Sequence, residues 1–302
     1  MRVFVTGASG HVGSAVIPEL LQAGHEVVGL ARSDQAAAKI EAAGATVRRG
    51  SLDDLELLAG SARESDAVIH LAFRHDWMVT GDFDGAVKSD LDATIAIGEA
   101  LAGSGKPLVT TSGTGMLAMG GITGRLGTEQ DVIEGGPRVD AENYVIGLAG
   151  QGVRSAVVRL PPTVHSDLDH HGFVPTLINI AREKGYGAYI GEGDNRWSAG
   201  NTRDAGHLYR LAVESAPAGS RLHAVGDEGV PFREIEETFG RMLGLPVRSI
   251  APEGAEEYYG FLARFAAMDS PASSALTRSL LGWEPSRPGL IADLELGHYF
   301  KP

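Results

Sequence analysis

Three glycines near the start of the chain constrain its fold more than any other feature. Gly7, Gly10 and Gly13 stand three apart, between an apolar run at residues 3–5 and an apolar repeat at helical spacing over residues 12–23. In a turn from strand to helix, the first glycine allows the tight turn, the second lets the backbone approach a pyrophosphate, and the third lets the helix pack on the strand. The start of that helix offers free N–H groups to phosphates. The pattern predicts a dinucleotide-binding site; a glycine-rich turn without a ligand is the alternative.

The composition narrows the classes of partner. The 302 residues include 26 Lys or Arg and 39 Asp or Glu, for a net charge of −13, and contain no basic run. This charge argues against nucleic acid or an anionic membrane as a partner. Without cysteine the chain has neither disulfides nor a thiol nucleophile. With no signal peptide and no apolar run of about 18 residues, we expect a cytoplasmic protein that acts on a small molecule.

Strands and helices alternate over the first 160 residues. Apolar runs predict strands at residues 3–5, 27–30, 45–48, 67–71, 108–111 and 156–160. Helical repeats between them predict helices at residues 12–23, 36–43, 52–59, 86–101 and 138–149. This alternation predicts the α/β class, with a Rossmann-type, doubly wound parallel sheet.

The alternation stops after Pro161 and Pro162. Beyond them, helices are expected at residues 174–184 and near 204–215, 232–243 and 255–268, with a short strand at 222–225. We therefore expect a nucleotide-binding domain over residues 1–164, with contributions from about 200–225. A smaller, mostly helical substrate-binding part is expected over residues 165–302.

Four segments, taken in order, give the chain a family resemblance. They are Thr6-Gly7-x-x-Gly10-x-x-Gly13, Val68-Ile69-His70-Leu71-Ala72, Val158-Arg159-Leu160-Pro161-Pro162-Thr163-Val164 and Leu280-Leu281-Gly282-Trp283-Glu284-Pro285. With them the chain resembles, nearly end to end, the extended short-chain dehydrogenase/reductase superfamily, which includes NAD(P)-dependent epimerases and dehydratases. The resemblance implies a nicotinamide dinucleotide as cofactor. It also implies a homodimer, because members of the superfamily often pair through the helices after the fourth and fifth strands.

The end of the second strand favours NADP(H) over NAD(H). NAD-specific members have an acidic residue there for the ribose 2′-hydroxyl, whereas this chain has Arg32 and Ser33, which suit a 2′-phosphate. Asp34 comes two residues too late, and a surface arginine is the alternative interpretation. The full predicted cofactor site, with Ser51 and Leu52 at the adenine, is Thr6, Gly7, Ser9, Gly10, His11, Val12, Gly13, Arg32, Ser33, Ser51, Leu52, Leu71, Ala72, Phe73, Pro161, Pro162, Thr163 and Val164.

The proton-transfer pair of the superfamily is missing. Members carry Tyr-x-x-x-Lys on the helix after the fifth strand, where the lysine lowers the tyrosine pKa. The matching positions here hold Arg138 and Glu142. Arginine does not exchange a proton and glutamate would raise a phenol pKa, so neither can play the original part. Tyr144 lies on the same helix but has Leu148, not lysine, four residues on, and Asp90 stands at the superfamily's Asn position.

Other side chains near the carboxyl ends of the strands are therefore the catalytic candidates. Ser112 or Thr114 matches the Ser/Thr that bonds the reacting group, and the sequence does not separate the two. His75 or His165 would supply a proton near neutral pH, with a hydrogen-bonded loop histidine as the alternative for each. Tyr144 is a further candidate.

Candidate substrate contacts are Trp77, Asn195, Arg196 and Trp197. The two tryptophans suit an apolar or aromatic substrate, and packing in the core or at a rim is the alternative. The adjacent His170 and His171, with Asp167 and Asp169 nearby, lack further ligand spacing, so we expect no metal site.

Three functions are compatible with these features. We favour an NADP(H)-dependent oxidoreductase that reduces a carbonyl, imine or activated alkene with a non-standard proton donor. The second is a nicotinamide-dependent epimerase, dehydratase or lyase. The third is an NADP-binding sensor or scaffold without turnover, because a fold alone does not fix a function.

Overall fold

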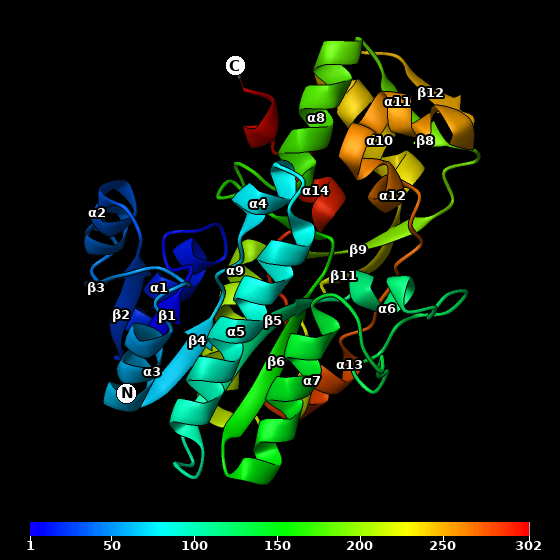
Figure 1. Cartoon of the computed structure of the whole chain (residues 1–302). Helices are drawn as coiled ribbons and strands as arrows, with labels where there is room; N and C mark the ends of the chain where they lie inside the picture. The colour runs from blue at the N-terminus through cyan, green and yellow to red at the C-terminus, as the bar shows by residue number, and fades with distance from the viewer. Residues whose placement is uncertain (302) are drawn as a thin grey trace.

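The computed structural model describes residues 1–301. At its centre is a parallel sheet of seven strands in the order β10-β6-β5-β4-β1-β2-β3 (Figure 1). The strands are β1 (Arg2–Thr6), β2 (Glu26–Ala31), β3 (Thr46–Arg49), β4 (Ala67–His70), β5 (Pro107–Gly113), β6 (Arg154–Leu160) and β10 (Ser220–His223). The strand order reverses at β1, which pairs with β2 on one side and β4 on the other. In such sheets ligands bind outside the carboxyl ends of the strands at this switch point.

Helices cover both faces of the sheet. On one face lie α1 (Gly13–Gln22), α2 (Asp34–Ala42) and α9 (Thr202–Ser215). On the other lie α3 (Leu55–Glu64), α5 (Phe83–Leu101) and α7 (Val139–Gly147), which continues into η1 (Leu148–Gln151). The central strands are buried on both faces, which explains why they are continuous apolar runs in the sequence.

A second, smaller part with its own apolar core packs beside the carboxyl ends of the sheet (Figure 1). Its strands are β7 (Thr163–His165), β8 (Gly187–Ile190), β9 (Arg196–Asn201), β11 (Asp227–Pro231) and β12 (Val247–Ile250). Its helices are α8 (Phe173–Lys184), α10 (Phe232–Leu243), η2 (Pro252–Gly254), α11 (Ala255–Tyr259), η3 (Gly260–Leu262), α12 (Ala263–Ala266), α14 (Leu290–Glu295) and η4 (His298–Phe300). The short helices outside it are α4 (His75–Val79), α6 (Gly115–Met119) and α13 (Ala275–Leu281).

The structure confirms the predicted Rossmann-type sheet and corrects the description of the second part. That part is mixed rather than mostly helical, since β7, β9 and β11 form one small sheet and β8 pairs with β12. The helix predicted at residues 255–268 is broken at Gly260, which has φ of +56°. Within residues 1–301, no helix has both the length and the apolar character needed to cross a membrane.

Candidate functional site

The glycine turn joins β1 to α1 at the switch point. Gly7 has φ of +66°, and a Cβ there would lie 2.7 Å from the backbone nitrogen of Ala72. A Cβ on Gly13 would overlap the carbonyl oxygens of Gly7 and Ala8. Gly10, by contrast, is exposed, and an added Cβ would meet only the Gly7 carbonyl, at 3.1 Å. The turn therefore needs glycine for close packing at two positions and offers open backbone at the third, which fits a pyrophosphate.

His11 ties this turn to the second part of the molecule. Its Nε2 lies 2.8 Å from Thr202 Oγ1, which also accepts a hydrogen bond from Ser166. Its Nδ1 lies 3.7 Å from a carboxylate oxygen of Asp169. Burial lowers the pKa of His11, and Asp169 opposes that effect. The ring already has partners within the protein, so the backbone N–H groups of the turn are the better donors for a phosphate.

The end of β2 carries the charges expected to choose between the coenzymes. Arg32 donates to Asp76 of α4 at 2.9 Å, and because these side chains are 59% and 44% exposed, the ion pair is weak. The Ser33 hydroxyl accepts a backbone N–H of α2 and caps that helix. Asp34 pairs with Arg49 at 2.7 Å. Arg32 is thus free to exchange its partner for a ligand phosphate, whereas Ser33 is committed to the helix.

The predicted adenine contacts lie in a loop with its own hydrogen bonds. The Ser51 hydroxyl accepts the Asp53 N–H at 3.2 Å, and Leu52 is buried. Asp53 accepts a hydrogen bond from Arg74, whose guanidinium lies 3.9 Å above the ring of Trp77. Trp77 was predicted to contact substrate, but the structure places it under Arg74, beside the predicted adenine loop.

A buried chain of polar groups crosses the switch point. Thr6 Oγ1 lies 2.8 Å from Nδ1 of His70, and Nε2 of the same ring lies 3.2 Å from Asp90. The Ala72 N–H donates to Thr6 Oγ1 at 3.2 Å. These groups hold β1, β4 and α5 together directly behind the glycine turn. We did not predict a role for His70, although a histidine at the end of an apolar strand was an available signal.

Arg138 lies at the carboxyl ends of β4 and β5, at the position of the superfamily's catalytic tyrosine. Its Nη2 donates to the Thr111 carbonyl at 3.1 Å, and its guanidinium lies 4.0 Å above the ring of Phe73. Its φ is +65°, in the left-handed region that is costly for a side chain with a Cβ. A cation therefore lies where the resemblance to the superfamily implies the catalytic tyrosine.

His75 stands next to this cation. Its ring packs edge to face against Phe73, with 5.1 Å between the ring centroids. Partial burial lowers the pKa of His75 and Arg138 lowers it further, while Asp76 and Asp90 oppose the shift. At pH 7 the ring is therefore largely neutral and accepts a proton; at lower pH its imidazolium is a stronger acid than free histidine.

The structure distinguishes the two Ser/Thr candidates. Ser112 is buried on β5 close to Glu142, whose pKa its side chain helps to lower, and within residues 1–301 its Oγ has no well-formed hydrogen bond. Thr114 Oγ1 lies 3.2 Å from Ser198 Oγ on β9, and its N–H donates to the Leu160 carbonyl. Thr114 therefore joins the two parts of the molecule, and Ser112 is the better candidate for bonding a ligand.

Glu142, at the position of the missing lysine, belongs to a buried ionic network. It accepts hydrogen bonds from Arg159 at 2.5 and 3.1 Å and from Arg221 at 2.8 Å. Burial favours the neutral carboxyl, but the two guanidinium groups hold the pKa of Glu142 below its ordinary value. Arg159 also lies 3.3 Å from Nε2 of His223, whose pKa burial lowers to about 4. Glu142 is thus held by two arginines within the fold and is not a substitute for the missing lysine.

Two further catalytic candidates, Tyr144 and His165, make contacts within the fold. The hydroxyl of Tyr144 donates to the Ile95 carbonyl at 3.4 Å, between α5 and α7, and burial, with Glu99, raises its pKa. His165 is fully buried on β7, where its Nδ1 lies 2.9 Å from a carboxylate oxygen of Asp293 on α14. Both side chains have partners within the fold away from Arg138, although the Nε2 of His165 has none within residues 1–301, and a catalytic role for either residue stays a prediction.

The predicted substrate contacts at the start of β9 also have partners within the fold. Trp197 is 1% exposed, and its Nε1 donates to a backbone carbonyl of residues 265–269. Asn195 donates to two carbonyls of the same segment, and Arg196 pairs with Asp269 at 3.3 Å. These side chains fasten that segment to β9, which a prediction from residue type alone did not reveal.

The loop after β6 joins the sheet to the second part. Pro161 and Pro162 lead directly from β6 into β7, where Thr163 and Val164 pair with residues 199–200 of β9. This arrangement places the predicted cofactor loop between the two parts of the molecule. The four residues of this loop, 161–164, were predicted only to line the cofactor site.

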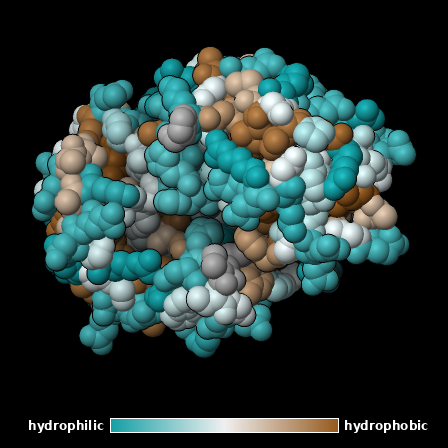
Figure 2. All heavy atoms as spheres, turned by 90° about the horizontal axis from the view of Figure 1, so that it is seen from above, coloured by the Kyte–Doolittle hydropathy of each residue, from teal (hydrophilic) through white to brown (hydrophobic). Residues whose placement is uncertain are grey.

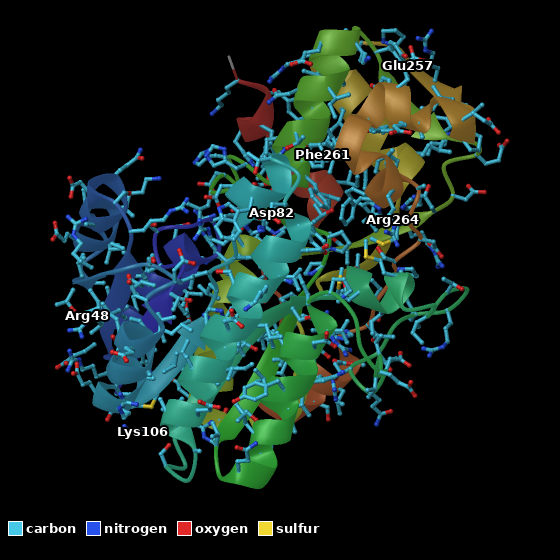
Figure 3. The ribbon with its side chains drawn as sticks, in the orientation of Figure 1. Arg48, Asp82, Lys106, Glu257, Phe261 and Arg264 are labelled. Atoms are coloured by element: carbon cyan, nitrogen blue, oxygen red, sulfur yellow. The ribbon has the colours of Figure 1, made fainter. Side chains whose placement is uncertain are left out.

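Lys106 does not replace the missing lysine. Lys106 donates to the carbonyls of Arg63 and Ser65 at 2.8 and 2.7 Å, at the amino ends of the strands and therefore opposite to the glycine turn (Figure 3). Over residues 1–301, His, Asp and Glu form no group of three that could hold a metal ion. The rings of His170 and His171 lie 6.4 Å apart.

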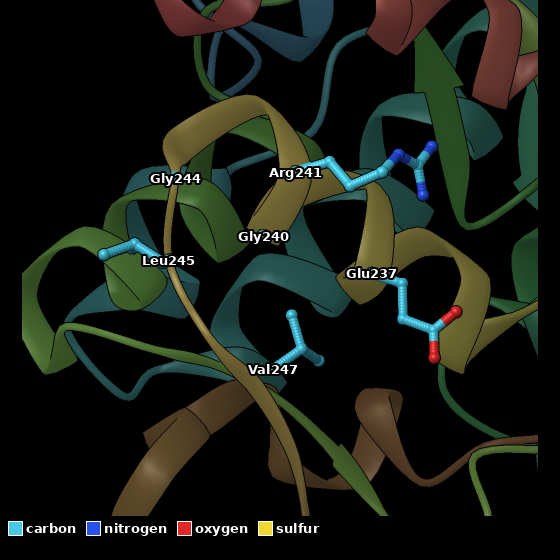
Figure 4. A pocket seen from close by; sticks show the side chains of 6 residues that line it. All are labelled: Glu237, Gly240, Arg241, Gly244, Leu245 and Val247. Atoms are coloured by element: carbon cyan, nitrogen blue, oxygen red, sulfur yellow. The ribbon is translucent and has the colours of Figure 1, made fainter.

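The two parts of the molecule flank a hollow. Seen from above, apolar atoms show in its walls between the two lobes (Figure 2). A separate pocket of about 410 Å³ lies at the end of α10, lined by Glu237, Gly240, Arg241, Gly244, Leu245 and Val247 (Figure 4). Glu237 and Arg241 are engaged in exposed ion pairs with Arg233 and Glu295. This pocket belongs to the second part alone, so the switch point is the stronger candidate site.

Comparison with known proteins gives a family match, sequence relatives and structures of similar fold. The family model described as "NAD dependent epimerase/dehydratase family" matches residues 3–225. The chain is 47% identical over 302 residues to uncharacterized protein C2A9.02 of Schizosaccharomyces pombe, covering 99% of this chain and 100% of that protein. It is 28% identical over 236 residues to a 4-hydroxy-2-methyl-3-oxo-4-farnesyl-3,4-dihydroquinoline-1-oxide ketoreductase of Stigmatella aurantiaca, covering 72% and 66%. The fold is similar to dTDP-glucose 4,6-dehydratase DesIV of Streptomyces venezuelae with NAD and TYD bound, with a TM-score of 0.77, 21% identity and coverage of 99% and 96%.

Proposed function

Because the chain belongs to the NAD-dependent epimerase/dehydratase family, we propose that it is an NADP(H)-dependent oxidoreductase that reduces a small carbonyl compound, imine or activated alkene. One observation carries this proposal. The glycine turn contacts Ala72, and the next residue, Phe73, packs against both His75 and Arg138. The predicted cofactor turn and two groups able to act on a polar substrate are therefore contiguous.

The residues present fit a dinucleotide. Gly10 leaves backbone open for the pyrophosphate, and the first turn of α1 offers N–H groups to it. Arg32 offers a planar cation to a 2′-phosphate, since its present pairing with Asp76 is exposed and weak. When bound, the reduced nicotinamide supplies the hydride.

His75 is the proposed proton donor. Because its pKa lies below the ordinary value, the protonated ring that reduction requires is populated only on the acid side of neutrality. The neutral ring at pH 7 suits the reverse direction, in which it accepts the proton of an alcohol. The proposal therefore includes a rise in the rate of reduction as pH falls from 7.5 to 6.

Two features bear on the reaction class. The Tyr-x-x-x-Lys pair is replaced by Arg138 and Glu142, and Glu142 is held in the buried network with Arg159. One relative is named a ketoreductase. We propose the same reaction class here, on a substrate whose reduction does not require a tyrosine as proton donor.

The test is titration of the purified protein with NADPH and NADH, followed by assay of aldehydes, ketones, imines and enones. Tighter binding of NADPH and its oxidation by at least one class support the proposal. The His75→Gln variant should slow turnover more than tenfold while leaving NADPH affinity unchanged. Turnover without net NADPH oxidation would indicate an epimerase or dehydratase, and tight binding without turnover a sensor or scaffold. A cytosolic location and a homodimer through α5 and α7 remain predictions.

A further inference from the structure

Arg138 has a backbone conformation that a glycine would adopt more easily than an arginine. Arg138 is the one non-glycine residue with positive φ within residues 1–301. A glycine in its place would adopt φ of +65° without strain. Strained positions of this kind persist where the surrounding structure enforces them, and they are concentrated at ligand sites. The presence of an arginine at this position is therefore explained by its side chain and not by the backbone conformation of the turn.

The guanidinium of Arg138 also lacks a charged partner. Over residues 1–301, no carboxylate oxygen lies within 4.0 Å of its nitrogens, whereas the guanidinium groups of Arg32, Arg159 and Arg221 each contact one. Its one hydrogen bond is to the Thr111 carbonyl, which uses one of five N–H donors. In a chain with 39 acidic residues, a half-buried cation at the end of the sheet is left available.

Phe73 and His75 define what this cation can do. The Phe73 ring lies 4.0 Å from the guanidinium, and His75 packs on the same ring. A planar fork with free donors matches the two oxygens of a carboxylate and binds them in pairs. An anion there would sit within reach of the group proposed to donate the proton.

We infer that Arg138 binds a carboxylate of the substrate, so that the substrate class is a small oxo-acid. This inference rests on the proposed function. In the reaction the hydride that bound NADPH would supply, becoming NADP⁺, forms a C–H bond at the ketone carbon, and the C=O π electrons move to oxygen. That oxygen takes the proton from the His75 imidazolium. The carboxylate is unchanged, and Arg138 holds it so that the ketone faces the proton donor.

The experiment compares oxo-acids of four to eight carbons with their methyl esters, using NADPH and three variants. Arg138→Gln removes the charge, Arg138→Lys keeps it without the fork, and Arg63→Gln removes an exposed arginine of α3 as the matched control. We expect wild-type kcat/KM to favour an acid over its ester by at least a hundredfold. Arg138→Gln should lose that preference, Arg138→Lys should keep part of it, and Arg63→Gln should keep all of it.

A second readout does not depend on turnover. Sodium butanoate and sodium 3-hydroxybutanoate, added to protein with NADP⁺, should raise the temperature of unfolding of wild type and Arg63→Gln but not of Arg138→Gln. Any of three results would overturn the inference. The wild type could have equal kcat/KM for acids and esters, Arg138→Gln could keep the wild-type preference for acids, or carboxylates could leave the unfolding temperature of the wild type unchanged. Failure to bind NADPH would overturn the proposed function instead. In that case, a carboxylate shift that is lost only in the Arg138 variants would still support the anion site.

Discussion

Arg32 and Asp76 form an ion pair of 2.9 Å between the end of β2 and the short helix α4. The pair stands where a 2′-phosphate is expected, so the carboxylate and the coenzyme compete for one guanidinium. Asp76→Asn should therefore raise NADPH affinity about threefold and leave NADH affinity unchanged. Arg32→Glu should lower NADPH affinity by more than tenfold and spare NADH. Fluorescence titration measures both affinities in each variant. Equal losses of affinity for NADPH and NADH in Arg32→Glu would show that Arg32 does not bind the 2′-phosphate.

The glycine turn should separate binding from folding. Gly10→Val adds a side chain to open backbone, so it should abolish coenzyme binding while changing the free energy of unfolding by less than about 1 kcal/mol. Gly13→Ala places a Cβ against the carbonyls of Gly7 and Ala8 and should cost roughly 1–3 kcal/mol. Urea unfolding and coenzyme titration of both variants check this. A Gly10→Val protein that still binds NADPH would mean that the turn does not carry the phosphates.

The backbone at Arg138 should reveal its strain when the side chain is removed. Arg138→Ala and Arg138→Gly both lose the contacts with Phe73 and Thr111, so their difference isolates the positive φ. We expect the glycine variant to be more stable than the alanine variant by about 1 kcal/mol. Thermal and urea unfolding measure this difference. Equal stabilities would indicate that the turn relaxes and stores no strain.

The buried network around His223 predicts loss of stability in mild acid. Its pKa is about 4 in the folded protein and about 6.5 in an unfolded chain, so the unfolded state binds the proton first. The stabilising contribution is complete above pH 6.5 and is lost as the pH falls towards 4. The loss is on the order of 3 kcal/mol. Urea unfolding between pH 7 and 4.5 should show this slope, and His223→Gln should flatten it; an unchanged slope would assign it to other groups.

Tyr144 should be dispensable for chemistry. Its hydroxyl makes one long hydrogen bond, to the Ile95 carbonyl, in the contact between α5 and α7. Tyr144→Phe should leave kcat and coenzyme affinity within twofold and change stability by less than about 1 kcal/mol. Steady-state kinetics with any substrate found in the panel test this. A hundredfold loss of kcat would restore Tyr144 as a catalytic candidate.

The sequence predicted six strands of the parallel sheet because the central strands are apolar on both faces, and it placed a further short strand at residues 222–225, where β10 completes the sheet. It did not predict β7, β8, β9, β11 and β12. The segment 196–201, for example, mixes arginine, tryptophan, serine and glycine, because its two faces meet different neighbours. Such short strands are defined by their pairing partners, which local periodicity does not report.

The candidate site was predictable where the signal was local and not where partners came from distant segments. The glycine spacing indicated the turn, and alignment from β6 put Arg138 at the position of the tyrosine. The roles of His165 and Glu142 depended on Asp293 and Arg221, which lie 128 and 79 residues away. No pattern within one segment reveals such pairs. The left-handed backbone of Arg138 was likewise invisible, since only the surrounding fold enforces it.

The chain crosses between its two parts more than once, and this affects how the protein could have diversified. After entering the second part it returns to supply α9 and β10 to the first, and the Trp283 ring is buried in the first core, where its Nε1 donates to the Asp204 carbonyl. A cut after residue 164 would leave β6 as an open edge and remove α9 from its face of the sheet. The second part therefore cannot be exchanged as a unit without disrupting the sheet of the first part. New substrate specificities would have to arise by substitutions in the loops of the second part, while α9 and β10 are retained to complete the first.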